Sequence, residues 1–273
     1  MTAEVAVLCG DCSDPVLRTW AEQLALQLDL PLTYSHKMTG EYHLMLRVGE
    51  QGLELVKPAD PHLNGPVRVD FTAGRAAFRR KQQKKELLLR AAGCKKGVAL
   101  NVIDATGGLG RDSFLLAAAG CRVQVFEQQP VIAALLAEGL ERAAAHPETA
   151  AIAGRIRLTV GDAVTALQAM QADEEGKGRT GKAVDVVYID PMFPERKKSA
   201  LVKKELQMLQ MLAVPEAAPE RLLAAALGTA TNRVVVKRPL KAPFLTARSP
   251  SHSLAGKTVR FDVYMQPHVN WAD

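Results

Sequence analysis

From residue 99 onward, the chain alternates between short apolar runs and segments with helical spacing of apolar residues. The apolar runs predict strands at 99–105, 121–127, 155–163, 184–190, 232–239 and 258–265. The intervening segments predict helices at 111–120, 130–145, 201–212 and 219–230. Strands that alternate with helices favour a parallel sheet with both faces covered. We therefore expect an α/β fold with a doubly wound, mostly parallel sheet.

The first 65 residues are organised differently. They predict a strand at 4–9 and a helix at 15–28, with Asp14 as N-cap and Pro15 at the first helical position. Short alternating runs at 42–48, 53–57 and 67–71 predict further strands, of which the first two form a hairpin. We expect a small N-terminal α+β domain at 1–65 and a larger domain at 66–273.

Two polar segments of the larger domain have their own predictions. Residues 74–92 form a basic segment with helical spacing and predict one helix. Residues 172–182 are polar, glycine-containing and aperiodic, and predict a surface loop.

Composition excludes several classes of protein. Hydrophobic residues make up 48% and charged residues 23%, which is typical of a globular chain. Four cysteines do not make a disulfide scaffold, although Cys9 and Cys12 form a C-x-x-C pair, and the six histidines form no metal-ligand cluster. No run is long enough to span a bilayer, and no secretory signal begins the sequence. We expect a cytoplasmic monomer without metal or membrane association.

A glycine-rich turn, DATGGLGRD, follows the predicted strand at 99–105. In a doubly wound sheet such a turn lets a ligand approach the backbone beside a helix N-terminus. Glu127 ends the next strand, where a carboxylate accepts hydrogen bonds from ribose hydroxyls. These features predict a nucleoside-containing ligand, and the imperfect G-x-G-x-x-S at 108–113 leaves a nicotinamide cofactor open. The predicted ligand-binding residues of the turn are Asp104, Thr106, Gly108 and Gly110.

A second motif, YIDPMFP, spans residues 188–194 at the end of another predicted strand. The Asp190 carboxylate and the Pro191 carbonyl are hydrogen-bond acceptors, and Phe193 offers a flat apolar ring. These groups suit an aromatic base with an exocyclic amine, because they accept its hydrogens and stack on its ring. We predict Asp190, Pro191 and Phe193 as the catalytic group.

Basic residues cluster close to these motifs. Lys and Arg number 35 against 29 Asp and Glu, so the net charge is +6. Solvated charged faces are common, but three clusters around one predicted site favour contacts with nucleic-acid phosphates. The predicted RNA-binding residues are Arg75, Arg79, Arg80, Lys81, Arg196, Lys197, Lys198, Lys237 and Arg238.

The glycine-rich turn, Glu127 and the D-P-M-F-P motif together resemble class I S-adenosylmethionine-dependent methyltransferases that modify amino groups. Met192 stands at the second proline of their motif, and Thr106 at the first glycine of their turn. From about Val67 to Tyr264 the chain resembles the bacterial small-subunit ribosomal RNA (guanine-N2)-methyltransferases of the J type. The strings that carry this resemblance, in the same order, are VDF (69–71), RRK (79–81), DATGGLGRDSF (104–114), YIDPMFPERKKSALVKKE (188–205), VVVKRP (234–239) and RFDVY (260–264).

The resemblance implies a Rossmann-like methyltransferase domain with S-adenosyl-L-methionine as cofactor and S-adenosyl-L-homocysteine as product. It implies that the partner is 16S rRNA or the small ribosomal subunit, and that the target is the N2 amine of a guanine. It also implies that further residues bind the cofactor: Arg111, Asp112, Glu127, Gln128, Asp162, Ala163 and Asp190.

Other functions stay open on the motifs alone. The same chemistry suits adenine N6, cytosine N4 or a protein amine as methyl acceptor. A non-catalytic RNA-binding assembly factor could retain the fold, and a nicotinamide oxidoreductase would bind NAD(P) in place of the methyl donor.

Overall fold

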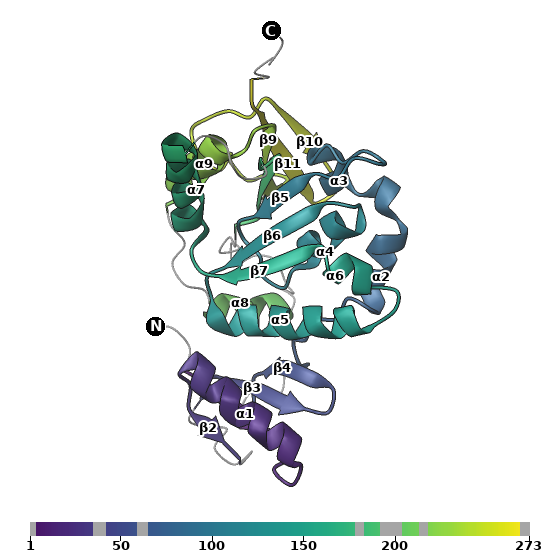
Figure 1. Cartoon of the computed structure of the whole chain (residues 1–273), viewed down its shortest axis with the longest axis vertical. Helices are drawn as coiled ribbons and strands as arrows, with labels where there is room; N and C mark the ends of the chain where they lie inside the picture. The colour runs from purple at the N-terminus through teal and green to yellow at the C-terminus, as the bar shows by residue number, and fades with distance from the viewer. Residues whose placement is uncertain are drawn as a thin grey trace. The chain divides into compact units, whose positions relative to one another are not determined.

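The computed structural model describes residues 4–34, 42–58, 65–177, 183–191, 204–212 and 218–267, apart from the side chains of a few helical residues. The chain divides into two compact units. The first unit comprises residues 1–69, 129–140 and 192–214, and the second comprises residues 70–128, 141–191 and 215–273. Each unit has a sheet of its own (Figure 1).

The first unit is built on a four-stranded sheet of order β2-β1-β3-β4. Strand β1 is parallel to β2 and β3, whereas β3 and β4 form the predicted antiparallel hairpin. Helix α1 covers β1 and spans Pro15–Leu28, the predicted range. Asp14 is its N-cap, because the side chain accepts hydrogen bonds from the backbone N–H groups of Val16 and Leu17. The strands are β1 (Val5–Cys9), β2 (Leu32–Thr33), β3 (Leu44–Gly49) and β4 (Gly52–Val56).

The predicted strand at 67–71 is wrong in its extent. Only Val67 pairs, through an isolated antiparallel bridge to Leu55 of β4. Asp70 then turns the chain, because its carboxylate accepts hydrogen bonds from the backbone N–H groups of Thr72 and Ala73. A local side-chain turn therefore replaces the ladder that alternation alone predicts.

The second unit is built on a seven-stranded sheet of order β10-β11-β9-β8-β5-β6-β7. Strands β7, β6, β5, β8 and β9 are parallel, and β11 is antiparallel to both β9 and β10. The doubly wound, mostly parallel sheet predicted from sequence is therefore confirmed. The strands are β5 (Asn101–Asp104), β6 (Arg122–Glu127), β7 (Ile156–Val160), β8 (Val186–Ile189), β9 (Arg233–Pro239), β10 (His252–Ala255) and β11 (Val259–Met265).

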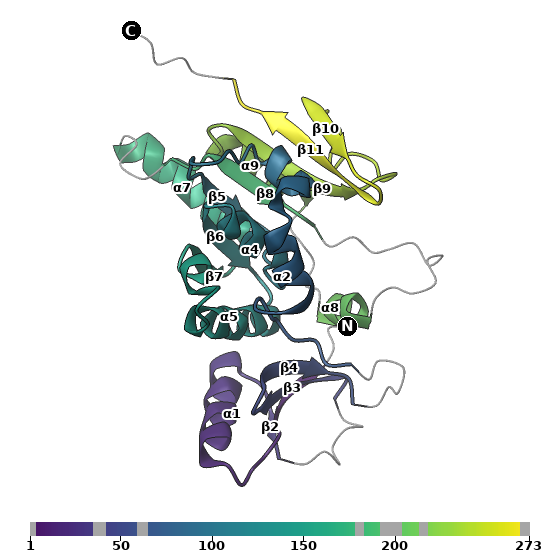
Figure 2. The same cartoon turned by 90° about the vertical axis from the view of Figure 1, so that its right-hand side faces the viewer.

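Helices cover both faces of this sheet (Figure 2). Helix α4 packs on β6 and β7 and contacts α2 (Gly74–Lys81) and α6, whereas α9 packs on β8 and β9 and contacts α7. The central strand β8 is buried along its whole length, as a strand between two helical layers must be. The helices are α4 (Arg111–Ala118), α5 (Pro130–Ala145), α6 (Ala150–Ala153), α7 (Ala163–Lys177), α8 (Lys204–Leu212) and α9 (Pro219–Thr229); α8 and the first part of α5 belong to the first unit.

The basic segment at 74–92 is broken, although its spacing predicts one helix. It forms α2 (Gly74–Lys81), a 3₁₀ turn at Gln83–Lys85 and α3 (Leu87–Ala91). The break lets the Glu86 carboxylate accept two hydrogen bonds from the Arg79 guanidinium, each 2.9 Å long. A charged pair made across the break therefore competes with helix continuity.

Four further elements differ from the predictions. Helix α7 extends to Lys177, so the first part of the predicted loop at 172–182 is helical, and the rest lies outside the described residues. Strand β10 was not predicted, because His252–Ala255 is mostly exposed and carries no run of apolar residues. The two-residue strand β2 and the one-turn helix α6 were also not predicted.

Candidate active site

The carboxyl ends of β5, β6, β8 and β9 meet at one edge of the seven-stranded sheet. Asp104 ends β5, Glu127 ends β6, and Asp190 directly follows β8. Ile189 pairs with Val236, so Asp190 and Lys237 are the next residues of two neighbouring strands. Parallel pairing therefore gathers side chains that are more than 100 residues apart in the sequence at the edge where ligands bind in such sheets.

The glycine-rich turn packs tightly against β6. A Cβ atom on Gly107 would lie 2.5 Å from Cγ1 of Val125, and the Gly107 N–H donates to the carbonyl of Phe126 over 2.8 Å. Gly108 and Gly110 have φ angles of 52° and 69°, which side chains rarely allow. The Gly108 N–H donates a 2.7 Å hydrogen bond to Oε2 of Glu127, so the turn is fixed to the end of the second strand.

Asp104 lies beneath this turn, 1% exposed. Its Oδ1 accepts a 3.1 Å hydrogen bond from the Thr106 N–H, and its Oδ2 accepts from the Ser113 hydroxyl. Burial raises the pKa of Asp104 to about 7, although these hydrogen bonds favour the carboxylate. Asp104 therefore holds the turn from below, where its side chain has little access to a ligand.

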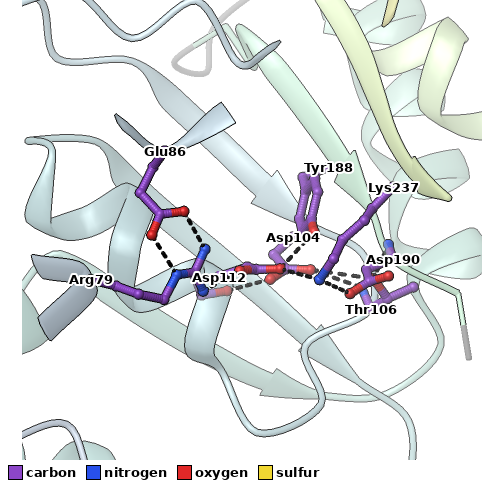
Figure 3. Close-up of polar contacts among 9 residues, drawn as sticks. Arg79, Glu86, Asp104, Thr106, Asp112, Tyr188, Asp190 and Lys237 are labelled. Atoms are coloured by element: carbon purple, nitrogen blue, oxygen red, sulfur yellow. Dashed lines mark hydrogen bonds and ion pairs between the residues drawn. The ribbon is translucent and has the colours of Figure 1, made fainter. Parts of the chain in front are cut away.

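Asp112, in the first turn of α4, is the centre of a charged network (Figure 3). Its Oδ1 accepts a 2.7 Å hydrogen bond from Arg79. Its Oδ2 accepts hydrogen bonds from Lys237 over 2.8 Å and from the Tyr188 hydroxyl over 2.7 Å. The Lys237 and Arg79 cations hold the pKa of Asp112 well below its usual range, despite the burial of the carboxyl group.

Asp190 is joined to this network through Lys237. Nζ of Lys237 lies 2.7 Å from Oδ2 of Asp190, and the Asp190 N–H donates a 2.7 Å hydrogen bond to Oγ1 of Thr106. Loss of solvation raises the pKa of Asp190, and the Asp112 charge adds to this effect, whereas the Lys237 ammonium opposes it. Pro191, the next residue, is buried. Phe193 lies outside the described residues.

The other predicted cofactor residues lie around the same edge. Arg111 is exposed at the first position of α4, and Gln128 directly follows Glu127. Asp162 is exposed and accepts hydrogen bonds from the N–H and hydroxyl of Thr165, next to Ala163 at the start of α7. Asp112 and Asp162 already have hydrogen-bond partners within the protein. The roles of all these residues in cofactor binding stay predictions.

The basic residues predicted to bind RNA have several partners within the protein. Arg79 binds Glu86 and Asp112, Lys237 binds Asp112 and Asp190, and Arg80 binds Glu148 over 2.7 Å. Arg238 is 4% exposed and donates a 3.0 Å hydrogen bond to the carbonyl of Pro243. Arg75 and Lys81 lie in α2, but their side chains are outside the description, as are Arg196, Lys197 and Lys198 altogether.

Three residues of the network were not singled out from the sequence. Tyr188 lies two residues before Asp190, and the two-residue period of a strand puts both side chains on one face. Ser113 donates a hydrogen bond to Asp104, and Glu86 accepts hydrogen bonds from Arg79. Glu86 carried a visible signal, because it is the first acidic residue after a run of basic ones.

A mostly parallel sheet with a tight glycine turn after β5 and a carboxylate closing β6 is typical of Rossmann-like proteins that bind a nucleoside cofactor. Among the described residues, no group of three or more histidine, cysteine, aspartate and glutamate side chains is arranged to hold a metal ion. None of the described helices combines the length and apolar character needed to cross a bilayer.

Comparisons with known proteins agree with this class. Residues 28–266 match the model of a family described as putative SAM-dependent methyltransferases. The crystal structure of a SAM-dependent methyltransferase from Neisseria gonorrhoeae superposes with a TM-score of 0.70 at 31% identity, over 98% of this chain and 97% of that one.

Curated relatives give a narrower assignment. A ribosomal RNA small subunit methyltransferase J from Pseudomonas aeruginosa is 44% identical over 95% of this chain and 93% of its own length. A protein of the same name from Ectopseudomonas mendocina is 44% identical over 89% of this chain and 88% of its own length. The chain therefore belongs to the ribosomal RNA small subunit methyltransferase J family of SAM-dependent methyltransferases.

Proposed function

We propose that this enzyme methylates the exocyclic N2 amine of a specific guanine in the 16S rRNA of the small ribosomal subunit. The observation that carries the proposal is Asp190, which lies at the edge of the sheet beside the glycine turn and has a half-buried carboxylate fixed by Lys237. The names of the relatives support a small-subunit rRNA substrate. Guanine N2 follows from the sequence resemblance.

The residues at the edge fit S-adenosylmethionine. The tight packing of Gly107 and the positive φ angles of Gly108 and Gly110 keep side chains away from the turn, so a ligand can approach the backbone. Glu127 lies at the end of β6, where a carboxylate binds ribose hydroxyls. We assign cofactor contacts to Gly108, Gly110, Glu127 and the segments at 111–112, 128 and 162–163. When bound, the cofactor supplies an electrophilic methyl group on a sulfonium.

The protein's contribution to the reaction is mainly orientation. The N2 amine of guanine is a weak nucleophile, because its lone pair is delocalised into the ring. The Asp190 carboxylate and the Pro191 carbonyl accept its hydrogens, and the Phe193 ring stacks on the base. Holding the amine in one direction raises the rate by proximity, without the need for a strong base. As the new N–CH3 bond forms and the bond from sulfur to the methyl group breaks, the proton that the amine loses passes to the Asp190 carboxylate or to water.

Substrate binding extends beyond the base. We propose that Arg75, Arg80, Lys81 and the basic segment at 196–198 contact rRNA phosphates and that these contacts fix position rather than read sequence. Arg79 and the buried Arg238 are not included, because their guanidinium groups bind partners within the protein. We further propose that residues 66–273 form the methyltransferase domain, that residues 1–65 form a separate domain, and that the enzyme acts as a monomer in the cytoplasm.

Methyl transfer from labelled S-adenosylmethionine to small ribosomal subunits tests the proposal. The subunits come from cells that lack this protein, and the product is digested to nucleosides and identified by mass. N2-methylguanosine should appear with the wild-type enzyme and be absent with Asp190→Ala. A methylated adenosine or cytidine would refute the assigned target, and wild-type turnover by Asp190→Ala would refute the assigned centre.

The stacking role of Phe193 has its own test. Phe193→Ala should lower kcat by about tenfold or more, because loss of base stacking is worth roughly 1–3 kcal/mol. Affinity for the cofactor, measured by calorimetry, should stay within about twofold. Equal losses in turnover and in cofactor affinity would count against stacking.

A further inference from the structure

Among the described residues, Lys237 is the one cation that contacts both Asp112 and Asp190. Its Nζ lies 2.8 Å from Oδ2 of Asp112 and 2.7 Å from Oδ2 of Asp190, and Figure 3 shows it between the two carboxylates. The lysine side chain is 26% exposed. Its position follows from strand register, since Val236 pairs with Ile189 and the next residues are Lys237 and Asp190.

The Asp112 side of this bridge is firmly anchored. Besides Lys237, Asp112 binds Arg79 and the Tyr188 hydroxyl, and Arg79 is itself held by two hydrogen bonds to Glu86. The Asp112 carboxylate is 12% exposed, whereas that of Asp190 is 35% exposed. Lys237 therefore connects a fixed, buried carboxylate to a more accessible one.

We propose that Lys237 is a positioning residue for Asp190, in that it engages Oδ2 and thereby presents Oδ1 to the amine of the substrate base. The inference rests on the proposed function, in which Asp190 accepts a hydrogen of that amine. In the described part of the chain, Lys237 is the only side chain that donates to Asp190, and its bond is to Oδ2. One oxygen is thus committed to the protein and the other is directed to the substrate.

The same bridge sets the charge of Asp190. The groups that face it are Lys237 from β9, Asp112 from α4, and Asp104 and Tyr188 from β5 and β8. Lys237 is the cation among them, and the others are acidic. Without the Lys237 ammonium, Asp190 loses the cation that contacts it while the like charge of Asp112 stays nearby, so the pKa of Asp190 rises. A protonated Asp190 is a poorer acceptor, because one of its oxygens becomes a donor.

This role differs from the phosphate contact that the basic sequence around Lys237 predicts. A lysine that left the bridge for a phosphate would separate two close carboxylates from their shared cation. Both ion pairs are short and partly buried, which makes that exchange costly. The geometry thus favours a role in turnover over a role in RNA affinity.

The test compares Lys237→Met with Lys237→Arg, and uses Lys96→Met as a matched control. Lys96 is exposed and lies before the first residue of β5, whereas Asp104 is the last residue of that strand. For each full-length variant, kcat and KM for small subunits are measured from pH 5.5 to pH 9 with saturating S-adenosylmethionine. The pKa of Asp190 is measured independently by carbon NMR of protein with labelled aspartate, assigned with Asp190→Asn.

Lys237→Met should lower kcat at neutral pH by about 100-fold, the scale expected when a catalytic group loses its orientation. The acid limb of kcat and the carboxyl pKa of Asp190 should both move to higher pH, so alkaline pH restores part of the activity. KM for the subunit should stay within about threefold. Lys237→Arg should keep the wild-type pH profile, and Lys96→Met should match wild type in every measurement.

A phosphate contact gives the opposite pattern: KM rises and depends less steeply on salt, while kcat and the pKa of Asp190 do not change. That result would overturn the proposal. If Lys237→Met fails to fold, Lys237→Gln removes the charge and keeps an N–H donor, and an unchanged Asp190 pKa in that variant would also overturn it. Should the wild-type protein transfer no methyl group to subunits, the NMR arm still tests the bridge, so the two failures are distinguishable.

Discussion

The two sheets of this protein differ in what they bury. In the first unit, β1 is buried along its whole length, β3 is buried at four of six residues, and Thr33 is the one buried polar residue among described residues 4–34 and 42–58. In the second unit, Asp104, Ser113 and Glu127 are buried together at the carboxyl edge of the sheet. Burying polar groups costs stability unless they are paired. The first sheet is therefore organised for packing, and the second accepts that cost where the chemistry takes place.

The largest expected effect is at the polar edge. Asp190→Asn keeps the shape of the side chain but replaces one acceptor oxygen with a donor, so it no longer matches the amine of the base. We expect kcat to fall by about 1,000-fold, within the range for loss of a positioned side chain that accepts a hydrogen of the reacting group. Single-turnover methyl transfer measures this, and calorimetry should show unchanged cofactor binding. Activity within tenfold of wild type would contradict the catalytic role of Asp190.

A substitution in the first unit should instead affect stability. Leu46 in β3 is fully buried, and Leu46→Ala should lower the free energy of unfolding by about 2–5 kcal/mol through lost burial and a cavity. Urea unfolding measures the loss, and Leu26→Ala, at a site 85% exposed, is the control with little expected change. At a temperature where Leu46→Ala is folded, kcat should equal that of wild type. A kcat defect would show that the first unit does more than pack.

Glu127→Gln tests whether Glu127, at the carboxyl edge of the second sheet, binds the ribose of the cofactor. Its amide oxygen can still accept the Gly108 N–H, but the charge that strengthens a hydrogen bond to a ribose hydroxyl is lost. We expect the Kd of S-adenosylmethionine to rise by about tenfold, the scale of one charge-assisted hydrogen bond. Calorimetry measures it, with Glu141→Gln, an exposed site on α5, as control. Equal affinities would place the ribose elsewhere.

The smallest expected effect is the pH dependence of stability at Asp104. Its pKa in the folded protein is about 7, above the ordinary value of 3.8, so the folded state favours the protonated form. This contribution to stability is present at low pH and is lost as pH rises through about 7. Asp104→Asn cannot ionise, so its Tm should fall less than that of wild type between pH 5 and pH 8. Parallel Tm curves would show that Asp104 does not titrate in this range.

Local patterns in the sequence predicted the regular elements well. Helices at 15–28 and 130–145 have the predicted bounds, since a proline at the start and apolar spacing are features of the segment itself. The parallel sheet followed from strands alternating with helices, and the positions of Asp104, Glu127 and Asp190 at strand ends followed from where the apolar runs stop. These features depend on residues close together in the chain.

What the sequence determined by itself is thus the α/β class, the glycine turn and the carboxylates at the strand ends. Only the tertiary structure decided the partners of the charges: Arg79 and Lys237 resembled RNA-binding residues in sequence, yet both bind Asp112, 33 and 125 residues away. The broken helix at 74–92 and the edge strand β10 were decided in the same way. The physical reason is that strand and helix patterns repeat over a few residues. An ion pair, by contrast, depends on which distant strand ends the fold brings within about 3 Å of each other.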